Sequence, residues 1–156
     1  CGNITPLEPL PESDIAGMAE GIVSRLGLVG SNGVDFLLTE EGAVVVEVNC
    51  RFQGSLDSVQ CATGVNLFQA HLNSFRGVLP ERPAIICSAG RAILYASRPL
   101  KIKERLLFPW TADVPRPGSR AERGDPFISV LARGSNREEV VGRLRERSDL
   151  VRKAFH

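Results

Sequence analysis

The sequence predicts an α+β fold in which helices pack against an antiparallel sheet. Two runs rich in β-branched residues, 34–39 and 43–49, are separated by three residues that end in glycine, which is typical of a β-hairpin. Apolar residues recur at helical spacing over 14–26 and 66–76. Strands joined by a short turn, with helices on either side in the sequence, favour a layer of helices on antiparallel strands.

Composition excludes several classes of function. Apolar residues make up 43% of the 156 residues and the net charge is +1, so there is no electrostatic case for nucleic acid or a membrane surface as a partner. No apolar run approaches the length of a bilayer span, and there is no signal-peptide pattern. The four cysteines lack the spacing of a zinc site or a disulfide framework. They therefore predict free thiols in a reducing cytoplasm.

The first elements are a lead-in and a helix. Residues 1–12 contain three prolines and are expected to be irregular. Ser13 is a suitable cap for a helix over 14–26, and Gly27 is a suitable stop. The expected apolar face of this helix comprises Ile15, Met18, Ala19, Ile22 and Leu26.

A hairpin, a loop and a second helix follow. Residues 40–42 suit a three-residue hairpin loop with Gly42 in the left-handed conformation. Residues 50–57 contain a glycine and no periodicity, which predicts a loop. The helix over 66–76 is expected to end before Gly77 and to carry His71 as a satisfied core or boundary histidine rather than a catalytic base. Its expected inward residues are Leu67, Phe68, Leu72 and Phe75.

The prolines at 80 and 83 indicate a boundary, which predicts one unit over 1–80 and a β-rich unit over 81–156 that ends in a helix. Residues 84–97 suggest strands, with a hairpin around Gly90. A long irregular crossing is expected over 108–126, where Trp110 either pins the crossing to the core or contacts a partner subunit.

The C-terminal segment is predicted to hold a strand over 127–132 and a helix over 136–147. Residues 135–138 fit a capping box. Val140, Val141 and Leu144 are expected to face inward, and the arginines and glutamates of the tail suggest a solvated, ion-paired helix face.

The hairpin carries the candidate chemistry. Side chains alternate between the two faces of a strand, so Val45, Glu47 and Asn49 share one face. Val44, Val46 and Val48 take the other face, toward the core. A loop over 40–42 pairs Thr39 with Ala43. Counting back from that pair places Asp35 opposite Glu47, with Cβ atoms about 5 Å apart.

Two like charges opposite each other destabilise a sheet unless a counter-charge is present. Mg²⁺ prefers oxygen ligands and commonly combines one or two carboxylates with phosphates, and Asn49 adds a third oxygen. Two ions bridged by Glu47 would also satisfy this set. The plainer interpretation is a pair of solvated carboxylates. Arg51 follows with a guanidinium suited to phosphate oxygens, and Gly54 and Ser55 could bring backbone N–H groups to an anion.

Asp35, followed by Glu47-Val48-Asn49 and then Arg51, resembles the metal-binding signature of the ATP-grasp superfamily. The stretches GSNGVDF (30–36) and RFQGSLD (51–57), with GNITP (2–6), resemble a mainly archaeal group of predicted ATP-dependent carboligases. GSNREE (134–139) is similar, over a shorter stretch, to the C-terminal region of biotin-carboxylase-type enzymes. The resemblance implies the C-terminal subdomain of an ATP-grasp domain followed by a small α/β appendage like that of biotin carboxylase.

The resemblance also implies a ligase reaction. ATP would phosphorylate a small carboxylate, and an amine or related nucleophile would displace phosphate from the acyl phosphate. By position, Asp35, Glu47 and Asn49 would bind one or two Mg²⁺ ions, with Mn²⁺ as a substitute, against the phosphates of ATP. Arg51 would be the catalytic residue that steadies the γ-phosphate and the acyl phosphate. The residues expected to face the acceptor substrate are Gln53, Gly54, Ser55 and Asp57.

Two features depart from the family. Cys50 stands where the family usually has proline, and the three lysines of the chain all lie after residue 100, whereas the family's phosphate-binding lysines lie upstream. We therefore expect the C-terminal half of a ligase, inactive alone, whose N-terminal half is missing; whether it forms a homodimer is left open. The alternatives are a non-catalytic ATP-grasp-derived module for nucleotide and metal binding or assembly, and a plain α+β domain without ligands.

Overall fold

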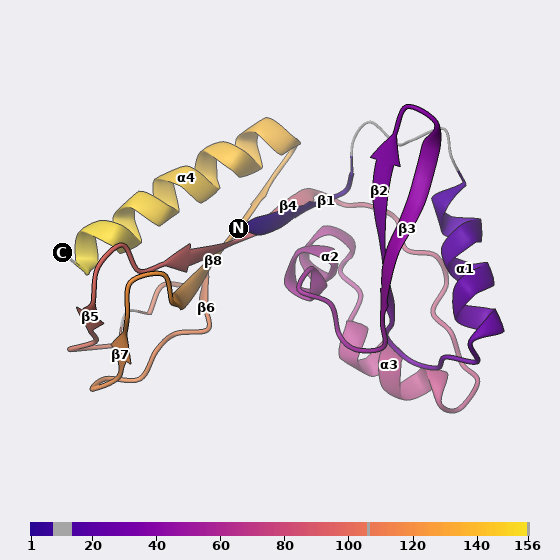
Figure 1. The fold of residues 1–156 in the computed structure, drawn as a ribbon, viewed down its shortest axis with the longest axis horizontal. Coiled ribbons are helices and arrows are strands. Elements are labelled where there is room, and N and C mark those ends of the chain that lie inside the picture. Colours follow the sequence, from indigo (N-terminus) through magenta and orange to yellow (C-terminus); the bar gives the residue numbers. More distant parts are fainter. Residues whose placement is uncertain (8–13, 106, 156) are drawn as a thin grey trace.

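The computed structural model of the protein describes residues 1–7, 14–105 and 107–155, and these form an α+β fold (Figure 1). The helices are α1 (Ile15–Arg25), α2 (Leu56–Thr63), α3 (Leu67–Ser74) and α4 (Arg137–Ala154). The strands are β1 (Gly2–Thr5), β2 (Gly33–Thr39), β3 (Gly42–Asn49), β4 (Ser88–Tyr95), β5 (Leu100–Lys101), β6 (Thr111–Ala112), β7 (Arg120–Ala121) and β8 (Pro126–Gly134). None of the helices in the described ranges combines the length and the apolar character that a membrane span requires.

The main sheet has the strand order β1-β4-β8-β6, and each pairing is antiparallel. Helices lie on both of its faces. A Cβ atom on Gly90 would meet Val140 and Leu144 of α4, whereas the neighbouring Arg91 contacts Asp57 of α2. Because successive residues of a strand point to opposite faces, α4 and α2 cover opposite faces of the sheet.

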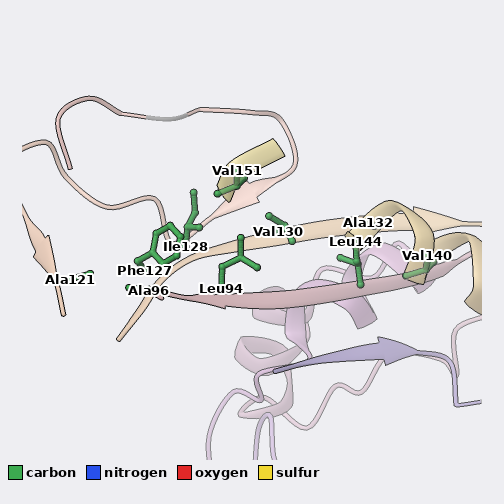
Figure 2. Packing of buried hydrophobic residues seen from close by; sticks show 10 residues of the cluster. All are labelled: Leu94, Ala96, Ala121, Phe127, Ile128, Val130, Ala132, Val140, Leu144 and Val151. Atoms are coloured by element: carbon green, nitrogen blue, oxygen red, sulfur yellow. The ribbon is translucent and has the colours of Figure 1, made fainter. Parts of the chain in front are cut away.

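The hydrophobic core lies between α4 and the main sheet (Figure 2). Residues of β4 and β8 that point to one face meet the apolar stripe of α4, in which Val140 and Val151 are fully buried. The residues of this cluster are Leu94, Ala96, Ala121, Phe127, Ile128, Val130, Ala132, Val140, Leu144 and Val151. Burial of these side chains provides the main driving force for folding in this half of the chain.

Strands β2 and β3 form a separate two-stranded sheet beside α1, α2 and α3 (Figure 1). Neither α1 nor α3 has a buried residue, and Leu37, Val44 and Val46 of the hairpin are exposed. An isolated hairpin is only marginally stable in water, because it buries little apolar area. The hairpin half of the described structure therefore presents apolar surface that a further element could cover.

The N-terminal lead-in was predicted incorrectly, because residues 2–5 form β1 and pair with β4. Residue 13, the predicted helix cap, lies outside the described residues; the observed cap is Asp14, which accepts a hydrogen bond from the Gly17 N–H group. The helix itself is confirmed, although Met18 and Leu26 of its predicted apolar face are exposed. Gly27 follows it with φ of 62°, as expected for a C-terminal stop.

Three further predictions need correction. Residues 56–63, partly assigned to a loop, form α2. The predicted inward residues Phe68, Leu72 and Phe75 are exposed, because the described elements cover that face only in part. Residues 88–95 form one continuous strand rather than a hairpin around Gly90. Gly90 is instead required by packing, since a Cβ atom there would lie 2.8 Å from Val140 Cγ1.

The last helix is longer than predicted and begins one residue later. Asn136 is its cap, accepting a hydrogen bond from the Glu139 N–H group at 2.9 Å, while Glu139 accepts hydrogen bonds from the backbone and hydroxyl of Ser135. Val140 and Leu144 face inward as predicted, and Val141 is half-buried. The division of the chain at residue 80 stays a prediction, and the pairing of β1 with β4 crosses it.

Candidate metal and phosphate site

The hairpin places Asp35 directly opposite Glu47, as predicted, by a different route. The turn contains two residues rather than three, so Thr39 pairs with Gly42, whose φ is 126°. A β-bulge then adds Val46 to β3 between the pairs Phe36–Val45 and Asp35–Glu47. The shorter turn and the extra residue cancel, and the two carboxylates return to the expected register.

The bulge also changes which residues share a face. Leu37 pairs with Val44 and Asp35 with Glu47, and both pairs point to the same side of the hairpin. Val44 and Val46 have exposed fractions of 53% and 64%, so the prediction that they face the core is wrong. The half-buried face instead includes Phe36 and Val45, which pair with each other.

Three oxygen-bearing side chains converge at the open end of this sheet. The amide Nδ2 of Asn49 lies 2.8 Å from Glu47 Oε1 and 3.4 Å from Asp35 Oδ2. Because amide oxygen and nitrogen can exchange places by a flip, Asn49 can present its oxygen to the same point. Two carboxylates and an amide oxygen are donors of the type that Mg²⁺ prefers, with water or phosphate completing its octahedron. Among the described residues, no group of three or more His, Cys, Asp or Glu side chains could hold a metal ion. A metal bound by Asp35 and Glu47 therefore needs further oxygen donors, such as the Asn49 amide, phosphate or water.

Arg51 lies in the turn that follows β3. Its backbone N–H group donates to the Asn49 carbonyl at 2.9 Å, and its exposed guanidinium donates to the Phe52 carbonyl through Nη1 at 3.1 Å. Arg51 is otherwise exposed to solvent, and it follows Asn49 by two residues in the chain. A planar cation in this position suits phosphate or carboxylate oxygens.

Gln53 holds the Arg51 turn in place. Its Nε2 donates to the carbonyls of Arg51 at 2.7 Å and Asn49 at 3.2 Å. Gly33 makes room for this side chain, because a Cβ atom there would lie 2.1 Å from the Gln53 amide carbon. The predicted substrate residue Gln53 is thus engaged within the loop through its NH₂ group, which leaves its oxygen as the group available to a ligand.

Asn3 is a site residue that sequence reasoning missed. From β1, its Nδ2 donates to the Gly54 carbonyl at 2.9 Å, and its Oδ1 lies 2.6 Å from the hydroxyl of the buried Ser58. Ser58 also lies 2.8 Å from the Ser55 carbonyl. These contacts fix the end of the loop and the start of α2. The one available signal was the resemblance of residues 2–6 to the carboligase group.

Arg91 is the second missed residue. Its Nη1 donates to Asp57 Oδ2 at 2.8 Å, and its Nη2 donates to Asp113, which also accepts a hydrogen bond from the Ser129 hydroxyl at 2.6 Å. The arginine side chain is only 18% exposed. The sequence did carry a signal for this role, because a guanidinium in the middle of an apolar strand must find partners for its buried charge. Arg91 therefore connects the first turn of α2 to the main sheet.

His71 and Cys50 lie outside this constellation. The Nδ1 atom of His71 accepts a hydrogen bond from the Ser31 N–H group at 2.9 Å, and its ring packs against Phe52 and Phe75. The prediction of a satisfied boundary histidine is confirmed. Cys50 is exposed, while Cys61 and Cys87 are half-buried.

Comparison with known proteins places these residues in context. Residues 1–55 match a protein family described as "ATP-grasp domain", and they include Asp35, Glu47, Asn49 and Arg51. An uncharacterized protein of Methanocaldococcus jannaschii is 25% identical over 139 residues, which cover 85% of this chain and 33% of that protein. The chain thus spans about a third of the length of this curated relative, whose archaeal source is consistent with the resemblance found in the sequence.

Solved structures share the fold over nearly the whole chain. The biotin carboxylase domain of Hydrogenobacter thermophilus 2-oxoglutarate carboxylase, solved with MgADP and bicarbonate, is 13% identical with a TM-score of 0.73, covering 93% of this chain and 37% of that one. The L-amino acid ligase of Bacillus licheniformis is 23% identical with a TM-score of 0.71, covering 95% and 42%. The match of residues 1–55 confirms the resemblance to the ATP-grasp domain, and the likeness to these solved structures confirms the predicted α+β fold.

Proposed function

We propose that this chain, with its ATP-grasp resemblance, is the C-terminal part of an Mg²⁺- and ATP-dependent ligase that activates a carboxylate as an acyl phosphate for attack by an amine or a related nucleophile. The convergence of Asp35, Glu47 and Asn49, two residues before Arg51 in the chain, is the observation that carries the proposal. It lies within the segment that matches the ATP-grasp domain, and related folds include a carboxylase domain with bound MgADP and an amino acid ligase.

Each residue has a proposed role. Asp35, Glu47 and Asn49 hold the metal through oxygen atoms, and bound Mg²⁺ supplies neutralising charge to the phosphates. Arg51 orients phosphate oxygens and stabilises negative charge that develops on them. Gln53 and Asn3 keep the Arg51 turn and the Gly54 carbonyl in fixed positions. The contribution of these residues is orientation and charge stabilisation, which dominate catalysis of phosphoryl transfer.

The loop after Arg51 is the proposed acceptor side of the site. Ser55 has a side chain that makes no capping bond to α2, and Gly54 has open space where a Cβ atom would be. Asp57 is held by Arg91. The hydroxyl of Ser55, the oxygen of Gln53 and the open space at Gly54 are therefore available to a substrate, and Asp57 acts by fixing the start of α2.

A further region of the same polypeptide is proposed to supply the opposite side of the nucleotide site. The chain spans a third of its curated relative, and all three lysines lie after residue 100. Leu37 and Val44 are exposed on the face that also carries Asp35 and Glu47. An apolar surface beside a phosphate-binding group suits a nucleotide enclosed between two lobes.

Metal binding is tested first on the 156-residue chain. The electron paramagnetic resonance signal of free Mn²⁺ should fall on addition of protein and return when Mg²⁺ competes. Glu47→Gln should abolish this binding, while Glu41→Gln, a neutral change in the hairpin turn, should preserve it. Binding that survives Glu47→Gln, or no binding by the wild-type chain, would contradict the metal site.

The ligase reaction is tested on the longer polypeptide that contains this chain. Incubation with ATP, Mg²⁺, candidate carboxylates and hydroxylamine should yield a hydroxamate from the trapped acyl phosphate. Arg51→Met should suppress hydroxamate formation. Metal and nucleotide binding without any hydroxamate or ADP release, across a panel of carboxylates, would favour the non-catalytic binding module instead.

A further inference from the structure

A second site is suggested by a cavity of about 350 Å³ on the face of the main sheet that α2 covers. Its walls come from α2, β4, β8, α4 and the segment before β6, and its volume lies in the range of small-molecule sites. The lining residues relevant to the argument are Asp57, Cys61, Trp110, Leu131, Arg133 and Arg147. None of them belongs to the metal ligands or to the Arg51 turn.

Two guanidinium groups line this cavity. Arg147 is half-buried, donates a hydrogen bond to the Leu131 carbonyl and lies 5.1 Å from the centre of the Trp110 ring. Burial, followed by the charge of Arg143, lowers the pKa of Arg147. The Arg133 carbonyl accepts a hydrogen bond from Arg143, whereas the Arg133 side chain makes no hydrogen bond or ion pair with any residue in the described ranges. Two cations close to a partly desolvated space favour an anionic ligand.

The single carboxylate of the cavity does not neutralise these arginines. Asp57 already accepts a hydrogen bond from Arg91 at 2.8 Å, and Arg91 is shared with Asp113. The lining residues therefore hold two positive charges against one carboxylate that is already paired. Trp110 and Leu131 supply apolar wall, and Trp110 is held in place because its ring stacks on Phe108 at 4.5 Å and its carbonyl accepts a hydrogen bond from the Leu131 N–H group.

We infer that this cavity binds a small carboxylate, with the carboxylate group on Arg133 and Arg147 and an apolar body against Trp110 and Leu131. A planar guanidinium matches the two oxygens of a carboxylate. The apolar walls favour an organic acid over inorganic phosphate, which has no apolar part to bury. The cavity is lined in part by Asp57 of the first turn of α2, which directly follows the proposed acceptor loop.

The identity of the bound acid as a substrate of the ligation rests on the proposed function, whereas binding itself does not. Asp57 is six residues from Arg51, so their Cα atoms lie within about 20 Å of each other even if the chain between them were fully extended. An acid anchored here would hold one end on the arginines and present the other toward the acceptor loop. The cavity would thus select substrates that carry a second, non-reacting carboxylate.

The test uses the fluorescence of Trp110, which is the chain's one tryptophan and lines the cavity. The 156-residue chain is titrated with benzoate, with its neutral analogue benzamide and with inorganic phosphate, without ATP or metal. Benzoate should change the emission saturably. Arg133→Met should lower the affinity for benzoate at least about tenfold, the factor expected from loss of a hydrogen bond to a charged group. Arg123→Met, at an exposed arginine outside the cavity, should bind as the wild type does.

Each other outcome overturns the inference. Equal changes in emission with benzoate and benzamide would show that the cavity does not recognise the carboxylate. A change with phosphate alone would show a site for inorganic anions. Binding that is unaffected by Arg133→Met, or no saturable response, would remove the site. Because Arg133 is exposed, its substitution should fold, which circular dichroism checks. Glu47→Gln should leave benzoate binding unchanged, so failure of the metal site and failure of this cavity are distinguished.

Discussion

Asp35 and Glu47 face each other across β2 and β3 and share the amide group of Asn49 as a hydrogen-bond donor. The amide partly compensates the two like charges, yet a neutral group cannot cancel them. Like-charged pairs at this spacing destabilise a sheet by roughly 0.2–1 kcal/mol. The hairpin therefore retains an unfavourable charge pair that a bound cation would relieve.

The first prediction concerns the stability of this pair. Without divalent metal, Glu47→Gln should raise the thermal midpoint slightly, by the equivalent of roughly 0.2–1 kcal/mol, because the repulsion disappears while an acceptor oxygen remains. Mg²⁺ should raise the midpoint of the wild-type chain, since a ligand that binds only the folded state stabilises it. Differential scanning calorimetry with and without Mg²⁺ measures both effects.

Glu41→Gln is the matched control for this prediction. Glu41 is exposed in the hairpin turn and pairs with no carboxylate across the strands, so its neutralisation should leave the Mg²⁺ effect intact. A wild-type midpoint that Mg²⁺ does not move, together with stabilisation by both Asp35→Asn and Glu47→Gln, would instead support a plain α+β domain.

The hairpin was predictable because its information is local. Alternation and a glycine-ended turn place Asp35 near Glu47. The predicted turn was one residue too long and the bulge was not predicted, and these two errors cancelled. The bulge at Val46 has no sequence signal, because valine suits a regular strand and a bulge equally. The face of Val44 and Val46 was consequently assigned incorrectly.

Features that depend on distant residues were not predictable. Asn3 acquires its role only when β1 pairs with β4 and reaches the Gly54 carbonyl, which is 51 residues away in the sequence. The apolar face of α3 indicates burial, yet Phe68 and Phe75 are exposed in the described structure. Periodicity shows which face is apolar, whereas the element that covers it comes from tertiary structure.

The second prediction concerns Gly33 and the Arg51 turn. Gly33→Ala would push the Gln53 amide from its position and break its bonds to the Asn49 and Arg51 carbonyls. Hydrogen exchange at residues 50–54 should therefore become faster, while the metal ligands are untouched. Gln53→Ala should have the same effect, and the double variant should be no worse than either alone, because both changes remove the same contacts. Additive effects would show that Gly33 acts independently of Gln53.

The third prediction concerns Arg91. Arg91→Met removes a cation that pairs with Asp57 and Asp113, which leaves Asp57 without its ion-pair partner and Asp113 with the Ser129 hydroxyl. Since Asp57 and Asp113 are partly exposed, the cost should be moderate, about 1–3 kcal/mol in the free energy of unfolding. Urea unfolding at neutral pH measures it. Arg120→Met, at an exposed arginine of β7, should cost less than about 0.5 kcal/mol. An equal loss in both variants would mean that Arg91 contributes no specific connection.

The fourth prediction is a pH dependence at the start of α4. Hydrogen bonds from the Ser135 backbone and hydroxyl, followed by the nearby Arg143 charge, lower the pKa of Glu139 below its ordinary value of 4.5. A carboxyl group with a lowered pKa in the folded state stabilises the protein above its unfolded pKa, and this stabilisation is lost as the pH falls through the folded pKa. The urea midpoint of the wild-type chain should thus fall on acidification below about pH 4.5.

Glu139→Gln should reduce this acid sensitivity, because glutamine has no proton to bind at that position. At neutral pH the same variant should be less stable than the wild type, since a neutral amide accepts more weakly from Ser135 and no longer pairs with Arg143. Glu146→Gln, on the exposed side of the same helix, provides the control and should retain the wild-type pH profile. If Glu139→Gln kept the full acid sensitivity, the loss of stability would have to arise from other carboxylates, and the charge of Glu139 would contribute nothing to it.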